Sequence, residues 1–219
     1  MKLRSTFIFA VLSGILLFSS GCQSAYYGTM EQFGVHKRDI LVDRVEEAKE
    51  AQEEAKEQFS SAFDEFLAVS GVEMGGLKEA YDRLNNEFEK SEKRAEAVWD
   101  RIDGISGVSK ALFKEWESEL EQYSNQDLRS ASESQLRTTE QLYAKLELSM
   151  RTAASQMEPV LDAFRDQTLF LKHNLNAQAV AALNKTSLGL KDEVRALIEQ
   201  MEASISEANA FIDTMRVGN

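Results

Sequence analysis

The side chains of this sequence best suited to nucleophilic, metal or proton-transfer chemistry are one cysteine and two histidines. In a helical di-iron centre each histidine follows a glutamate by three residues, but His36 and His173 follow Phe33 and Phe170 at that distance. The sequence has no His-Glu-x-x-His motif, and Cys22 has no second cysteine with which to bind zinc. We therefore expect no metal centre.

Common catalytic motifs are missing as well. No Gly-x-x-x-x-Gly-Lys-Ser/Thr stretch is present to hold a phosphate group. The stretch GISGV is close to a nucleophile elbow, but Val108 stands where the second glycine belongs. Because we identify no nucleophile paired with a base, we expect that the chain is not an enzyme and uses no cofactor.

The polar stretch LKHNLN allows two interpretations. In the first, His173, Asn174 and Asn176 form a binding site on a helical bundle, which would make the protein a ligand-binding or enzymatic module. In the second, the stretch joins two helices and its amides cap neighbouring backbone groups. We favour the second interpretation and keep the first as the alternative.

Cys22 ends a segment that is typical of a secretory signal. Two basic residues precede the apolar run 7–18, and small residues precede the cysteine. The run is shorter than the ~20 residues that a membrane-spanning helix needs. The small residues resemble a bacterial lipobox, although Ser19 stands where an aliphatic residue is usual. We predict a signal peptide over residues 1–21 and acyl chains such as palmitate on Cys22, rather than a free thiol behind an ordinary signal.

The residue after the cysteine suggests a destination. In the lipoproteins that this segment resembles, an aspartate there often retains the protein in the inner membrane, so Gln23 favours the outer membrane of a Gram-negative bacterium, facing the periplasm. Residues 22–37 would then form a lipidated tether. Tyr26, Tyr27 and Phe33 could lie at the membrane interface, or Phe33 could pack on the folded domain, and both interpretations stay open.

The chain is acidic and rich in helix-forming residues. It has 25 Lys and Arg against 37 Asp and Glu, and removal of residues 1–21 leaves 23 basic residues and a net charge of −14. Nucleic-acid-binding proteins instead gather basic residues, so we expect no nucleic-acid partner. The expected partners are the membrane, through the lipid on Cys22, and another protein or a second copy, through helices.

Apolar residues recur at alternating steps of four and three over residues 38–70. The positions are Leu41, Val45, Ala48, Gln52, Ala55, Phe59, Ala62, Phe66 and Val69, and only Gln52 is polar. This heptad pattern predicts a coiled-coil helix. A second heptad pattern runs from Leu77 to Ile102 after a glycine-rich stretch, which predicts an antiparallel partner helix.

The remaining sequence predicts more helices. Gly104 and Gly107 predict a break, followed by a shorter helix over 109–123. The SNQD stretch supplies N-cap residues for the next helix, Pro159 predicts a kink or a restart, and LKHNLN predicts another irregular point. We predict an all-α fold for residues 38–219, an elongated bundle of four to five long helices with an antiparallel coiled-coil hairpin.

From Tyr26 onward the chain resembles a family of uncharacterised lipoproteins of Gram-negative bacteria, a domain of unknown function. The resemblance lies in the stretches YYGTMEQFGVHKRDILVDRVEEA, LFKEWESELEQYSN, MEPVLDAFRDQTLFLKHNLNAQAVAAL and IEQMEASISEANAFI. It implies a helical lipoprotein and carries over no catalytic residues. We expect a lipid-anchored periplasmic envelope protein that acts as a helical scaffold, spacer or interaction module.

Overall fold

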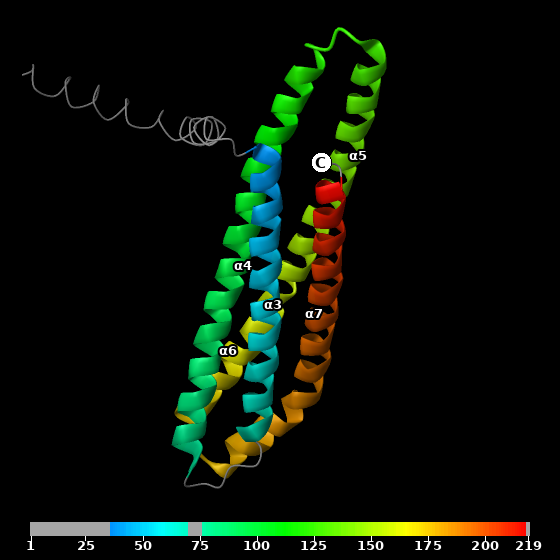
Figure 1. Ribbon diagram of the computed structural model, residues 1–219. Helices are drawn as coiled ribbons and strands as arrows, with labels where there is room; N and C mark the ends of the chain where they lie inside the picture. The colour runs from blue at the N-terminus through cyan, green and yellow to red at the C-terminus, as the bar shows by residue number, and fades with distance from the viewer. Residues whose placement is uncertain (1–35, 70–75, 218–219) are drawn as a thin grey trace, which may run out of the picture.

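The computed structural model describes residues 36–69 and 76–217, which form five helices arranged as four antiparallel legs (Figure 1). The helices are α3 (Lys37–Val69), α4 (Leu77–Leu120), α5 (Gln126–Ser155), α6 (Met157–His173) and α7 (Ala177–Val217). α3 and α4 form a hairpin, α5 and α6 follow one another along the third leg, and α7 is the fourth leg. The prediction of an all-α bundle with an antiparallel hairpin is confirmed.

The heptad stripe predicted for α3 is its buried face. All nine predicted positions, from Leu41 to Val69, are at most 2% exposed. They face α4 and α7, the two legs against which α3 packs. Across the bundle the Phe59 ring stacks on Phe164 of α6, with ring centroids 6.3 Å apart. Spacing alone therefore identified most of the buried face of α3, although Ile40 and Val42, which lie outside the pattern, are buried as well.

α4 differs from the prediction. It runs without interruption through Gly104 and Gly107, so the predicted break and the separate helix over 109–123 are both wrong. A glycine inside a helix costs only ~1 kcal/mol relative to alanine. Ile105 and Val108 stay buried on the core face, and their packing offsets that cost. At ~1.5 Å per residue, the 44 residues of α4 give the bundle a length of ~66 Å.

The third leg is interrupted where the sequence predicted. α5 ends at Ser155 and α6 begins at Met157, so Pro159 lies in the first turn of α6 and marks a restart. Proline is tolerated there because the N–H groups of a first turn have no partner within the helix. At the start of α5, the Asn125 side chain accepts hydrogen bonds from the N–H groups of Asp127 and Leu128, which confirms the N-cap predicted in SNQD.

α7 packs against three other helices, α3, α5 and α6. Phe211, Ile212 and Met215 near its end are each at most 3% exposed. Phe211 contacts Tyr143 of α5, with ring centroids 6.4 Å apart.

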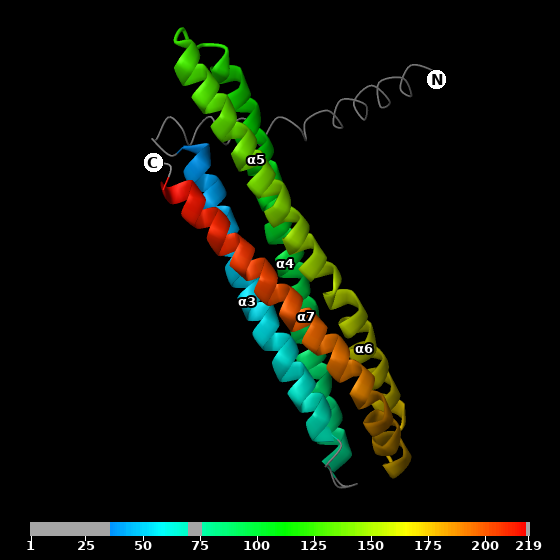
Figure 2. The same ribbon diagram turned by 90° about the vertical axis from the view of Figure 1, so that its right-hand side faces the viewer.

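Two helices project beyond the others at one end of the bundle. Figures 1 and 2 show that α4 and α5, with the turn between them, extend beyond the start of α3 and the end of α7. We call residues 116–140 the α4–α5 tip. α3 therefore begins toward the end of the bundle that carries this tip.

Candidate functional site

Several predicted features lie outside the described residues. These are the signal peptide over 1–21, the lipidated Cys22 and the aromatic residues of the tether, Tyr26, Tyr27 and Phe33. Their roles stay predictions.

The LKHNLN stretch joins α6 to α7. The Asn174 side-chain amide donates a hydrogen bond to the carbonyl of Phe170 at 2.9 Å. The backbone N–H of Asn174 donates to the carbonyl of Leu171 at 3.2 Å. His173 and Asn176 are exposed, and the Asn176 N–H donates to the Asn174 carbonyl at 2.8 Å. The structure thus shows Asn174 making the capping contacts that the favoured interpretation expects, while a binding role for His173 stays a prediction.

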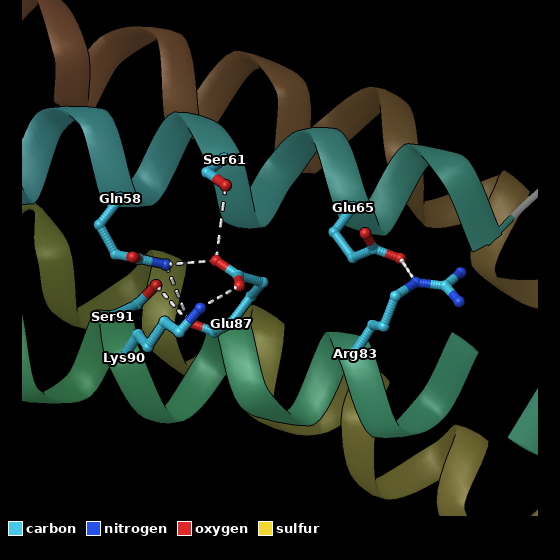
Figure 3. Close-up of polar contacts among 7 residues, drawn as sticks. All are labelled: Gln58, Ser61, Glu65, Arg83, Glu87, Lys90 and Ser91. Atoms are coloured by element: carbon cyan, nitrogen blue, oxygen red, sulfur yellow. Dashed lines mark hydrogen bonds and ion pairs between the residues drawn. The ribbon is translucent and has the colours of Figure 1, made fainter. Parts of the chain in front are cut away.

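A polar cluster joins the two helices of the α3–α4 hairpin (Figure 3). The Glu87 carboxylate of α4 accepts hydrogen bonds from Gln58 Nε2 at 2.7 Å and from Ser61 Oγ at 3.5 Å, both on α3. Lys90 Nζ lies 2.7 Å from its second oxygen. Gln58 also donates to the Glu87 backbone carbonyl at 3.3 Å, and Ser91 Oγ donates to the same carbonyl at 2.8 Å. Glu87 therefore joins α3 to α4 by polar contacts at this level of the hairpin.

The surroundings of Glu87 favour its charged form. Burial raises the pKa of Glu87, but the hydrogen bonds from Lys90, Gln58 and Ser61 together lower it by more than burial raises it. The pKa therefore lies below its ordinary value of 4.5. A lowered pKa means that Glu87 stabilises the folded state above the unfolded pKa. That stability is lost as the pH falls through the folded pKa.

Replacing this carboxylate should make the bundle less stable in a pH-dependent way. We expect Glu87→Gln to lower the free energy of unfolding by about 1 kcal/mol at pH 7, the size of one charge-assisted hydrogen bond partly exposed to water. The difference should shrink as the pH falls below about 4. Urea unfolding followed by circular dichroism at pH 7, 5, 4 and 3 measures it.

Glu89→Gln is the matched control, because Glu89 accepts its hydrogen bond from Asn85 on the same helix. It should change the unfolding free energy little at any of these pH values. A Glu87→Gln effect that stays constant from pH 7 to pH 3 would contradict the role of the carboxylate charge.

The start of α3 is fastened to two other helices. Lys37 Nζ donates to Glu115 Oε1 of α4 at 2.9 Å. Arg38 donates from Nε and Nη2 to the carbonyl of Met215 at 3.1 and 2.5 Å. The last carbonyls of a helix have no partner within it, so Arg38 caps the C-terminal end of α7. These contacts join residues far apart in the chain, and no sequence pattern signalled them.

The α4–α5 tip carries a groove of about 280 Å³ between its two helices. Its lining residues are two leucines and six charged residues: Glu117, Leu120, Glu121, Arg129, Glu133, Leu136, Arg137 and Glu140. Trp116 Nε1 donates to Ser132 Oγ at 2.8 Å and so connects the two helices of the tip. Near the turn, Tyr123 and Leu128 are 41% and 58% exposed. The tip therefore presents both apolar and acidic side chains.

Metal-binding clusters and membrane-spanning helices are absent from the described residues. Over residues 36–69 and 76–217, no group of three or more His, Cys, Asp and Glu side chains is placed to hold a metal ion. None of the helices in these ranges combines the length and the apolar character that crossing a membrane requires. The buried polar residues among them carry hydroxyl or amide groups: Gln52, Ser91, Ser109, Thr139, Thr168 and Ser204.

A protein-family model matches most of the chain. The family described as "Protein of unknown function (DUF2959)" matches residues 26–215. The chain belongs to this family. No curated protein and no solved structure matches the chain.

The limits of the DUF2959 match can be compared with the bundle. The match ends at Met215, in the last turn of α7. Met215 is the residue whose carbonyl accepts the hydrogen bonds from Arg38. It begins at Tyr26, ten residues before the first described residue. The match therefore covers the bundle up to the last turn of α7, together with residues 26–35 before it.

Proposed function

We propose that this DUF2959 protein is a lipid-anchored envelope protein that acts as a helical scaffold or protein-interaction module. Acyl chains on Cys22 would hold it at the outer membrane, on the periplasmic side. The observation that carries the proposal is that α3, the first described helix, begins toward one end of a ~66 Å bundle. A rod held at one end by a short tether presents its long sides and its far end to other proteins.

A non-enzymatic role is part of this proposal. Three surface grooves of the described part lie between neighbouring helices, and charged or polar side chains make up at least half of the lining of each. The buried polar groups in the same ranges are hydroxyls and amides, which do not act as acids or bases near neutral pH. Such surfaces suit contacts between helices of different proteins.

The anchor is tested by replacing the thiol. We expect Cys22→Ser to move the protein from the membrane fraction to the soluble fraction while its far-UV circular dichroism stays helical. Each acyl methylene contributes ~0.8 kcal/mol to membrane binding, so the loss of several chains should release the protein almost completely. Immunoblots of membrane and soluble fractions measure the distribution.

Two further variants make the test specific. Ser24→Ala should stay with the membrane, and Gln23→Asp should move the protein from the outer to the inner membrane on a sucrose gradient. Recovery of the Cys22→Ser protein in the membrane fraction after a carbonate wash would contradict the anchor. Crosslinking of the parent protein in intact cells then tests the scaffold role by showing which proteins it touches.

A further inference from the structure

We propose that the α6–α7 turn, residues 169–176, binds the surface of a lipid bilayer that carries anionic headgroups. The turn lies at the end of the bundle opposite the α4–α5 tip (Figures 1 and 2). The inference goes beyond the proposed function, because it concerns this folded turn and does not depend on lipidation of Cys22.

Large apolar side chains are exposed together in this turn. Of the seven that are exposed among the described residues, three fall within residues 169–175: Leu169 at 49%, Phe170 at 41% and Leu175 at 44%. Single exposed apolar residues are common on protein surfaces, whereas a cluster of them marks an interaction site. The turn therefore has the apolar part of a binding surface.

The last turn of α6 combines apolar side chains with basic ones. Its exposed residues are Leu169, Phe170, Lys172 and His173, while Leu171 between them is fully buried. Residues three and four apart on a helix are neighbours, so Leu169 lies next to both Lys172 and His173. Such a surface suits a membrane interface, where the apolar side chain enters the lipid boundary and the lysine ammonium reaches the headgroups.

The charge around the turn is positive in an otherwise acidic chain. Residues 167–191 contain Lys172, Lys185 and Lys191 but no Asp or Glu, although the whole chain has 37 acidic residues. Lys172 and Lys185 are exposed. Lys185 of α7 and Gln167 of α6 line the same groove of about 350 Å³, which places Lys185 alongside the last turns of α6. This local charge favours an anionic surface.

Acidic residues flank this stretch without entering it. Asp166 and Asp192 bound it in the sequence, and Glu193 shares the groove with Lys185. Two acids near the same end of α3 and α4 are ion-paired: Glu65 with Arg83 at 2.7 Å, and Asp82 with Lys78 at 2.8 Å. Attraction to anionic lipid is therefore confined to the α6–α7 turn, and the rest of the acidic rod is repelled.

The size of the surface favours a bilayer over a protein partner. A stable protein interface buries roughly 800 Å² on each partner, which is more than three apolar side chains at a helix end supply. A membrane interface instead accepts individual aromatic and leucine side chains, and nearby lysines add attraction to anionic headgroups.

The experiment places a fluorescent reporter in the turn. The chain has two tryptophans, so the full chain with Cys22→Ser, Trp99→Phe and Trp116→Phe has none and lacks the acylation site. In this background Phe170→Trp puts a tryptophan in the turn. On addition of phosphatidylglycerol vesicles with brominated acyl chains, its emission should shift to shorter wavelength and be quenched. Brominated phosphatidylcholine vesicles should quench it far less.

The lysines are tested in the same chain. Lys172→Gln/Lys185→Gln should weaken binding to the phosphatidylglycerol vesicles by roughly thirtyfold, which corresponds to ~2 kcal/mol for two lysines. Lys93→Gln/Lys114→Gln is the matched control, because these exposed lysines of α4 change the net charge equally. It should leave binding nearly unchanged.

A second reporter position makes the test specific to the turn. Leu148→Trp replaces Phe170→Trp, because Leu148 is 70% exposed on α5, away from the turn. Its emission should not be quenched. In the chain with its own tryptophans, Phe170→Ser/Leu175→Ser should stay unbound when phosphatidylglycerol vesicles are floated on a sucrose gradient. Far-UV circular dichroism should stay helical in every variant.

Several results would overturn the proposal. These are absence of quenching in the Phe170→Trp chain, equal quenching in the Leu148→Trp chain, and quenching that the lysine substitutions do not weaken. An emission shift that appears without vesicles, at concentrations where light scattering shows a dimer, would instead assign the turn to a second copy. A carbonate wash removes a peripheral contact of this kind but not an acyl anchor, so this proposal and the anchor fail separately.

Discussion

Replacing Phe164 by alanine is expected to lower the free energy of unfolding by about 3–5 kcal/mol, the cost of emptying a fully buried aromatic site. Phe164 is 1% exposed and lies on α6, where its ring stacks on Phe59 of α3. The contact joins two legs on opposite sides of the bundle, beyond the hairpin contacts of α3 with α4. The cavity left by the substitution would lie between these legs, because the helices around it are held in place by their other contacts.

Phe170→Ala is the matched control for this prediction. Phe170 lies on the same helix, but it is 41% exposed, so the same substitution should cost about 1 kcal/mol or less. Urea unfolding of both variants, followed by circular dichroism at 222 nm, gives the two free energies. Equal losses in the two variants would contradict the placement of Phe164 in the core.

The heptad spacing predicted the core of α3 because a coiled-coil contact depends on local periodicity. Leu41, Phe59 and Val69 could each be assigned to the buried face from their distances along the chain, without knowledge of the partner helix. Pro159 was predictable for a similar reason, since a proline inside a helical pattern permits only a kink or a first turn.

Gly104 and Gly107 show where local signals fail. Glycine often ends a helix, but its cost inside one is only ~1 kcal/mol, and the buried residues around these glycines outweigh it. A Cβ atom placed on Gly104 would meet no heavy atom within 4 Å, so this glycine lies on an open face and is not required by packing. The wrong prediction came from treating a weak preference as a stop signal.

The polar contacts between legs could not be predicted from sequence. Arg38 and Met215 are 177 positions apart, and Gln58 meets Glu87 because of how α3 and α4 align. Side-chain type limits which pairs can form, but the alignment of the legs decides which do form. For the same reason the capping role of Asn174, a local contact, could be predicted from sequence, whereas the partner of Lys37 on α4 could not.

Gln52 is the polar residue in the buried stripe of α3, and it pairs with a buried serine on α7. Ser204 Oγ donates to Gln52 Oε1 at 2.9 Å, and both residues are fully buried. Among the described residues, Gln52 Nε2 has no hydrogen-bond partner. Ser204→Ala would also leave the Gln52 carbonyl oxygen without its partner. We expect a loss of about 1–3 kcal/mol in unfolding free energy, the cost of an unpaired buried polar group.

Removing both polar groups should reverse this loss. Leucine is close to glutamine in size, so in Gln52→Leu/Ser204→Ala two apolar side chains replace a pair that includes an unsatisfied amide, and the variant should be at least as stable as the parent. Gln52→Leu alone should cost little, because the Ser204 hydroxyl can donate to a carbonyl of its own helix. Urea unfolding of the four proteins gives the coupling energy. A double variant as unstable as Ser204→Ala would mean that this pair stabilises the bundle by more than its polar groups cost to bury. A stable double variant would instead leave positioning of α3 against α7 as the reason for a polar residue in the stripe.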